Sequence, residues 1–148
     1  MITIKTYSHH EPASAYIQKE IGHFLFENLE QYGDPEEHIQ KCLDYAFGKD
    51  QKPGGLVITA TDTATQKLAG AVILNKTGME GYIPENILVY IATDKELRGK
   101  GVGKKLMQTA IENTDGDIAL HCEPDNPAKF LYEKLGFSSK YLEMRLKK

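Results

Sequence analysis

The sequence has little of several features that would assign it quickly to a class of protein. It holds only two cysteines, Cys42 and Cys122, far apart and in apolar surroundings. This excludes a disulfide framework and favours two buried thiols. No run of about 18 apolar residues occurs, as a membrane-spanning helix would need, and the first residues lack the apolar stretch of a secretory signal. We therefore expect a cytoplasmic protein with no membrane partner.

The sequence also lacks an excess of positive charge. Lysine and arginine number 18 against 21 acidic residues, and the formal net charge is -3. A broad basic surface for nucleic acid is not indicated, so any anion site must be local. The histidines lack the spacing to Cys or carboxylate partners that a metal site needs, so no metal is expected.

The hydrophobic pattern predicts one α/β domain over residues 1–148, long enough to bury a core. Alternating or continuous apolar runs predict strands at 2–7, 56–61, 68–76, 87–94, 118–123 and 141–148. Helical spacing predicts helices at 17–32, 35–47, 102–115 and 127–135. The order β-α-α-β-β-β-α-β-α-β indicates a mixed sheet covered by helices.

Capping residues define the second helix in this pattern. In "DPEEHIQKCLDYAFG", Asp34 is expected as the N-cap, Pro35 as the first helical residue and Glu37 as the partner in a capping box. Gly48 is expected to end the helix.

The segment "ELRGKGVGKKL", residues 96–106, combines three alternate glycines with four cations. It follows a strand apolar enough to be buried on both faces and precedes a helix. Glycines allow close approach to backbone N–H groups, and the first N–H groups of a helix attract anions. The segment therefore predicts a site for a phosphate-bearing ligand.

Two known phosphate loops fit this segment poorly. It is one residue too short for a Walker loop, and Lys105 stands where that loop needs Ser or Thr. A dinucleotide fingerprint would need a glycine in place of Lys104, although Glu123 lies about the right distance downstream. A nicotinamide-dependent oxidoreductase is kept as a weaker alternative, because too few residues follow Glu123 for further βα units.

A third pattern fits better. The run Arg98-Gly99-Lys100-Gly101-Val102-Gly103, followed about thirty residues later by "NPAKFLYEKLGF", resembles the GNAT superfamily of N-acetyltransferases. In that family the first motif holds the pyrophosphate of acetyl-coenzyme A. The second motif matches the family at Ala128, Tyr132, Gly136 and Phe137.

The resemblance implies a GNAT-like α/β fold and acetyl-CoA as cosubstrate, without a metal. It implies that the coenzyme contacts Ile91, Ala92, Thr93, Arg98, Gly99, Lys100, Gly101, Val102, Gly103, Lys104 and Asn126. The family's asparagine position falls on Asp125, so either Asp125 or Asn126 has that role. The resemblance makes Tyr132 the general acid toward the coenzyme sulfur.

The proton acceptor is less well defined. Histidine is the residue type best suited to accepting a proton at neutral pH, so His121 is the candidate base, with Glu123, Glu85 or a chain of water as alternatives.

The acceptor is expected to be a small or peptidyl primary amine, which attacks the thioester directly in a ternary complex. We expect it to enter between residues 77–86 and the first two helices, where Glu80 and Glu85 favour a cation. A non-catalytic acyl-CoA-binding module is the alternative function, and a homodimer is left open.

Overall fold

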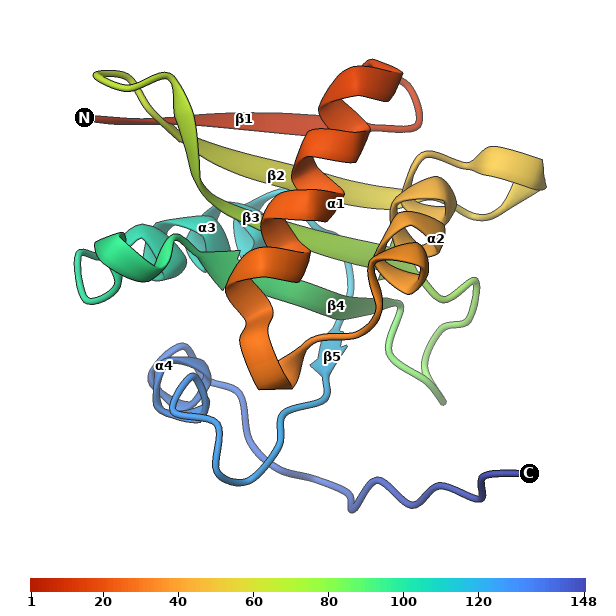
Figure 1. Ribbon diagram of the computed structural model, residues 1–148. Coiled ribbons are helices and arrows are strands. Elements are labelled where there is room, and N and C mark those ends of the chain that lie inside the picture. The colour runs from red at the N-terminus through yellow and green to blue at the C-terminus, as the bar shows by residue number, and fades with distance from the viewer.

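The computed structural model describes residues 1–148 and shows a five-stranded mixed sheet in the order β1-β2-β3-β4-β5 (Figure 1). The strands are β1 (Ile2–Ser8), β2 (Gly55–Asp62), β3 (Lys67–Lys76), β4 (Asn86–Thr93) and β5 (Ile118–Leu120). The helices are α1 (Ala15–Leu29), α2 (Glu36–Ala46), α3 (Val102–Glu112) and α4 (Lys129–Lys134). Short 3-10 turns are η1 (Glu30–Tyr32), η2 (Lys49–Gln51) and η3 (Lys95–Leu97). The predicted fold class, and the element order as far as α4, are confirmed.

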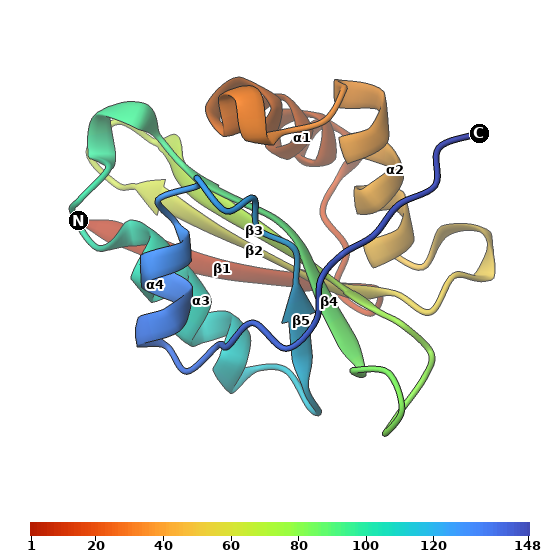
Figure 2. The same ribbon diagram turned by 90° about the horizontal axis from the view of Figure 1, so that it is seen from below.

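The helices cover both faces of the sheet (Figure 2). The pair α1 and α2 lies on one face, and α3 and α4 lie on the other. Ile21 and Leu25, one helical turn apart on α1, are fully buried on the first face. Leu106 and Ala110 of α3, also one turn apart, are fully buried on the second face. Each face therefore has its own apolar core. No helix is long and apolar enough to span a membrane.

The direction of strand pairing changes at β4. Strands β1 to β4 pair antiparallel, whereas β5 runs parallel to β4 and pairs only with residues 86–88. In the β3–β4 ladder Ile73 faces Tyr90 and Leu74 faces Leu88, so Val89 is an extra residue, a β-bulge. From this bulge onward β4 has no strand on its second side, and the sheet opens there.

The predicted cap of the second helix is wrong. Helix α2 begins at Glu36 with Pro35 in the N-cap position, and no side chain caps it. The carboxylate of Asp34 instead accepts a hydrogen bond from the hydroxyl of Tyr90 on β4. A nearly buried tyrosine hydroxyl needs an acceptor, and this demand takes precedence over the local capping pattern.

The predicted last strand does not form. Residues 138–148 carry no strand or helix assignment and make no backbone hydrogen bond. Alternation shows which side chains would share a face, but a strand also needs a neighbour, and none lies beside this segment. The strand predicted at 118–123 likewise ends earlier, at Leu120.

Candidate active site

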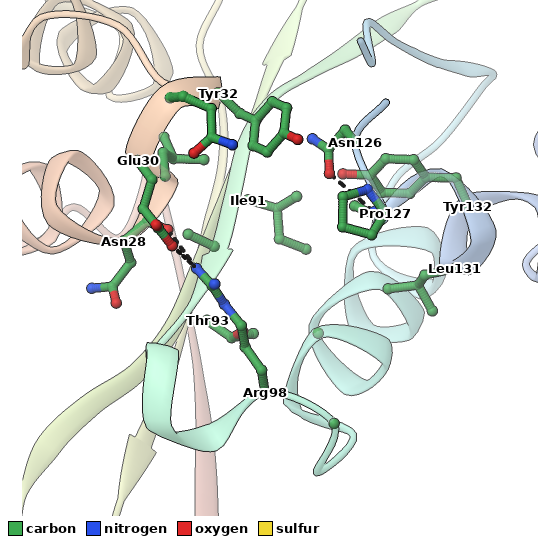
Figure 3. A pocket seen from close by; sticks show the side chains of 16 residues that line it. Asn28, Glu30, Tyr32, Ile91, Thr93, Arg98, Asn126, Pro127, Leu131 and Tyr132 are labelled. Atoms are coloured by element: carbon green, nitrogen blue, oxygen red, sulfur yellow. Dashed lines mark hydrogen bonds and ion pairs between the residues drawn. The ribbon is translucent and has the colours of Figure 1, made fainter. Parts of the chain in front are cut away.

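A cavity of about 590 Å³ lies between the open side of β4 and helix α4 (Figure 3). It is lined by residues from the end of α1 and η1, from β4, from the glycine-rich loop and from the start of α4. These are Asn28, Leu29, Glu30, Gln31, Tyr32, Ile91, Ala92, Thr93, Arg98, Gly99, Gly103, Asn126, Pro127, Ala128, Leu131 and Tyr132. Of the predicted site residues, the structure brings Tyr132, Asn126, residues 91–93, Arg98, Gly99 and Gly103 together here.

The β4 wall of this cavity presents backbone donors. The N–H of Asp94 donates to the carbonyl of Ala69 across the ladder, at 2.8 Å. Backbone groups alternate in an antiparallel strand, so those of Ile91 and Thr93 point away from β3, toward the open side. Ala92 also lines the cavity, but its backbone faces β3 and its side chain is buried.

The glycine-rich loop supplies a second set of free donors. The N–H groups of Gly99, Gly101, Val102, Gly103 and Lys104 make no hydrogen bond. Gly99 and Gly101 have φ of 81° and 83°, and a Cβ built on either would meet nothing within 4 Å. The loop is therefore an open cradle of N–H groups at the positive end of α3, as an anion site requires.

A second cavity, of about 400 Å³, adjoins this cradle. It is lined by the loop from one side and by Leu131 and Lys134 of α4 from the other. Lys104 and Lys134 both line it and give it positive charge, whereas Lys100 lines neither cavity. Sequence reasoning missed Lys134, because it lies two residues after the tyrosine of the second motif and matches no motif position.

Arg98 is directed toward the end of α1 (Figure 3). Its guanidinium donates to the carbonyl of Asn28 at 3.0 Å and forms an ion pair with Glu30 at 2.9 Å. Arg98 thus joins the loop to the opposite wall of the cavity. Both contacts are made by the same guanidinium nitrogen, Nη2.

Tyr132 lies on the α4 wall and is 8% exposed. Its ring packs edge-on against Phe137, and its hydroxyl makes no hydrogen bond. Burial, with a smaller contribution from nearby Cys122, raises the pKa of Tyr132 to about 12. The hydroxyl therefore stays protonated at neutral pH and is free to donate.

Asn126, rather than Asp125, lines the cavity with its side chain. Its Oδ1 accepts from the N–H of Ala128 at 3.0 Å and orders the turn before α4. Asp125 contributes its carbonyl, which accepts from the hydroxyl of Tyr32 at 3.4 Å. This contact bridges η1 and the turn before α4 at the edge of the cavity.

The structure does not bring the candidate bases to the cavity. His121 and Glu123 are exposed beyond the end of β5 and line neither cavity. Glu85 accepts hydrogen bonds from the N–H of Asp117 and of Gly81, and these bonds lower its pKa. Glu85 therefore ties two loops together. No three histidine, cysteine or carboxylate side chains lie close enough to form a metal site.

The pair formed by Asp34 and Tyr90 lies beside the cavity. Tyr90 precedes the lining residue Ile91, and Asp34 comes two residues after the lining residue Tyr32. Burial, reinforced by the bond to Asp34, raises the pKa of Tyr90. The Asp34 carboxylate forms no ion pair, so a negative charge without a cationic partner stands near the open end of β4.

A comparison with known protein families shows to which family the chain is related. Residues 53–139 match the acetyltransferase (GNAT) domain, which is more than half of the chain. The chain belongs to the GNAT acetyltransferase family. The matched part contains β4, the N–H cradle and Tyr132, whereas α1, η1 and α2 lie outside it.

A glucosamine 6-phosphate N-acetyltransferase of Oryza sativa is 29% identical over 112 residues. The aligned part covers 68% of this chain and 61% of that protein, so the similarity spans less than two thirds of the relative.

Solved GNAT structures share the fold. A glucosamine-6-phosphate N-acetyltransferase from Arabidopsis thaliana matches with a TM-score of 0.62 and 19% identity, covering 99% of this chain and 98% of that one. An aminoglycoside N-acetyltransferase in complex with CoA matches with a TM-score of 0.69 and 15% identity, covering 100% and 95%. At such identities the likeness concerns the fold alone.

Proposed function

We propose that this chain transfers an acetyl group from acetyl-CoA to a primary amine, which attacks directly while both molecules are bound. One observation carries the proposal. Free backbone donors of β4 and a free tyrosine hydroxyl face each other across one cavity, and this cavity adjoins an N–H cradle for an anion. Acyl transfer needs donors for a carbonyl oxygen and for a leaving sulfur.

The residues present fit acetyl-CoA, which supplies a thioester when it is bound. The cradle at residues 99–104 suits a pyrophosphate, because its N–H groups are unpaired and its glycines leave the approach open. Lys104 and Lys134 add positive charge beside it. The apolar side chains of Ile91 and Leu131 line the larger cavity, where the uncharged arm of the coenzyme would lie.

The N–H of Ile91 or Thr93 is proposed to donate to the thioester carbonyl oxygen when acetyl-CoA is bound. A fixed donor of this kind contributes about 10²- to 10³-fold in rate. Tyr132, on the other wall, is proposed to be the donor to the coenzyme sulfur. Its pKa of about 12 lies above that of a free thiol, about 8.5. Because Tyr132 is a weaker acid than the thiol, its hydroxyl is suited to donating a hydrogen bond to the negative charge that grows on the sulfur, and the departing thiolate would take its final proton from water.

The acceptor amine is proposed to approach from the η1 side rather than past residues 77–86. None of residues 77–86 lines either cavity, whereas residues 28–32 line the larger one. The carboxylate of Asp34, which accepts from the Tyr90 hydroxyl but has no cationic partner, would attract a cationic amine to this side. A water molecule is proposed as the base, because His121, Glu123 and Glu85 lie away from the cavity.

The relatives named as glucosamine 6-phosphate acetyltransferases suggest a phosphorylated amino sugar as a competing acceptor. Such a molecule needs a cation for its phosphate. Arg98, the cation that lines the larger cavity, is already paired with Glu30. Charge therefore favours a neutral or cationic amine.

The test is release of free thiol from acetyl-CoA with a panel of amines: glucosamine 6-phosphate, an aminoglycoside, a polyamine and peptides with a free N-terminus or lysine. Acetylation of at least one amine, confirmed by product mass, is expected. If acetyl-CoA raises the melting temperature but no amine is acetylated, the non-catalytic module is favoured. A melting shift with NAD and none with acetyl-CoA would contradict the proposal.

A further inference from the structure

One residue near the end of helix α1, Asn28, is tied to the segment that follows β4. Its side-chain oxygen, Oδ1, accepts a hydrogen bond from the backbone N–H of Lys95 at 3.2 Å. Its main-chain carbonyl accepts from Nη2 of Arg98 at 3.0 Å. Lys95 is the first residue of the turn η3 and Arg98 directly follows the last one, so Asn28 holds this turn at both ends.

A further hydrogen bond fixes the orientation of the Asn28 side chain. Its amide nitrogen, Nδ2, donates to the carbonyl of Phe24, one turn earlier on α1, at 2.9 Å. A carbonyl can only accept, so the nitrogen and not the oxygen of the amide faces Phe24. The oxygen is thereby left for the N–H of Lys95. Asn28 is half-buried and lines the larger cavity (Figure 3).

The N–H of Lys95 continues the row of backbone donors on the open side of β4. The N–H of Asp94 is bonded to β3, and successive N–H groups of a strand point to alternate sides. Those of Ile91, Thr93 and Lys95 therefore belong to one row that points away from β3. The pairing of β5 with β4 ends before this row begins. For Lys95, the acceptor that a neighbouring strand would supply is a side chain of α1.

We propose that Asn28 is a positioning residue for acyl transfer, an inference that rests on the proposed function. By holding Lys95, its amide sets the direction of the β4 backbone at Thr93, whose N–H would donate to the thioester carbonyl oxygen. Such a donor is effective only when it is aimed at that oxygen, and a misplacement of about 1 Å can lower a rate by about 10²-fold. Asn28 lies outside residues 53–139, so the family match does not include it.

Two variants separate this role from a role in the stability of α1. Asn28→Asp keeps an oxygen for the N–H of Lys95 but cannot donate to the carbonyl of Phe24. Asn28→Ser keeps a donor that reaches back to Phe24, but its hydroxyl lies one bond closer to the main chain and does not reach Lys95.

The first experiment measures single-turnover rates at saturating acetyl-CoA, so that changes in coenzyme affinity do not enter. Asn28→Asp should react at a rate close to wild type, although it loses the bond to Phe24 and should melt at a lower temperature. Asn28→Ser, and Asn28→Ala with it, should be slower by about tenfold to 10²-fold. The opposite order, a slow Asn28→Asp and a fast Asn28→Ser, would overturn the proposal.

Asn113→Ala is the matched control. Asn113 lies at the end of α3, and its Nδ2 donates to the carbonyl of Thr109, four residues earlier, at 2.8 Å, as that of Asn28 does to Phe24. Asn113 is exposed and lines neither cavity. The control should therefore lower the melting temperature, as Asn28→Ala does, and leave the rate unchanged. Equal losses of rate in both variants would mean that Asn28 only stabilises its helix.

The second experiment needs no acceptor amine. Isotope-edited infrared spectroscopy measures the stretching frequency of the acetyl carbonyl of bound acetyl-CoA, and a hydrogen bond to the carbonyl oxygen lowers this frequency. Binding to the wild type, Asn28→Asp and Asn113→Ala should lower it fully, and binding to Asn28→Ser or Asn28→Ala should lower it less.

The two readouts distinguish the possible failures. If no amine is acetylated, the proposed function fails, and the infrared frequencies still decide whether Asn28 positions the donor. A full shift in Asn28→Ser and Asn28→Ala would overturn the role of Asn28 and leave the proposed function intact. No shift in the wild type would contradict the β4 donor and overturn both.

Discussion

The two walls of the larger cavity differ in how their polar groups are satisfied. On the wall formed by β4, the glycine-rich loop and α4, backbone donors and the Tyr132 hydroxyl lack partners. On the wall formed by α1 and η1, polar groups already pair. Glu30 forms an ion pair with Arg98, the hydroxyl of Tyr32 donates to the carbonyl of Asp125, and the carboxylate of Asp34, next to this wall, accepts from Tyr90.

This difference separates two tasks. Free, fixed donors suit a ligand that always presents the same groups, as a coenzyme does, because nothing has to be broken before binding. Paired side chains must exchange partners before they can contact a ligand, so they respond to the particular molecule that arrives. The family match covers the first wall and not the second, which agrees with this division. Substitutions of Tyr132, Gly101 and Asp34 test it, and a substitution of Glu85 tests a loop contact outside both walls.

The largest effect on the reaction rate is expected from removing the free hydroxyl of the first wall. Tyr132→Phe should lower the single-turnover rate by about 10² to 10⁴, because the sulfur loses its donor. Acetyl-CoA affinity should change little, since one hydroxyl hydrogen bond contributes about 1 kcal/mol. Rapid-quench single-turnover kinetics avoids a product-release step that would hide the loss.

Tyr16→Phe is the matched control for this substitution. Tyr16 is 77% exposed on α1 and lines neither cavity, so its loss should leave the rate unchanged. An unchanged rate in Tyr132→Phe would leave Tyr132 as a packing residue beside Phe137.

The next effect concerns the cradle. Gly101→Val puts a branched side chain at a φ of 83° and over the N–H groups. Acetyl-CoA affinity should fall by about tenfold or more, as the cradle is distorted and covered. Lys100→Ala should lower acetyl-CoA affinity only about twofold, because an exposed charge is screened. Calorimetry measures both.

Gly81→Val controls for backbone strain in this comparison. Gly81 has a φ of 77°, open surroundings and no place in either cavity. The Gly81→Val variant should be less stable than wild type but should bind acetyl-CoA with unchanged affinity. Equal affinity losses in Gly101→Val and Lys100→Ala would count against the backbone cradle.

A milder change tests the second wall. Asp34→Asn keeps an oxygen for the Tyr90 hydroxyl but removes the charge. The KM for a cationic amine should rise by about five- to tenfold, with acetyl-CoA affinity unchanged. Asp44→Asn is the control, because Asp44 lies on α2 and pairs with Lys49 outside the cavity. If the two variants behave alike, Asp34 does not attract the acceptor.

The smallest effect concerns Glu85, whose pKa is lowered by the N–H donors of Asp117 and Gly81. A lowered pKa means that the folded state favours the charged form. Its stabilisation is therefore present above the unfolded pKa, about 4.3, and is lost as the pH falls through the folded value.

Glu85→Gln should accordingly lower the melting temperature at neutral pH, and the difference from wild type should shrink in acid. Glu80→Gln, in the same loop but without side-chain hydrogen bonds, should show no such trend. A difference that stays constant from neutral to acid pH would contradict this role for Glu85.

The glycine-rich loop could be predicted from sequence because its geometry is local. Gly99 and Gly101 take the positive φ that their residue type permits, whatever lies around them. Apolar periodicity in the same way predicted the element order as far as α4. The contacts of Tyr132 and of residues 91–93 with the coenzyme remain predictions, although the structure places these residues around one cavity.

The second wall could not be predicted, because its contacts join distant parts of the chain. Arg98 meets Glu30, and Asp34 meets Tyr90, with no local pattern linking either pair. The Asp34–Pro35 pattern instead favoured a cap. His121 was assigned to a face of a strand that ends one residue before it.

The most direct test of the central claim is hydrogen exchange of individual backbone amides with and without acetyl-CoA. The free N–H groups of residues 99 and 101–104, and those of Ile91 and Thr93, should become protected when acetyl-CoA binds. The amides of residues 77–86 should not change. Binding of acetyl-CoA that leaves the exchange of the loop and β4 amides unchanged would contradict the account.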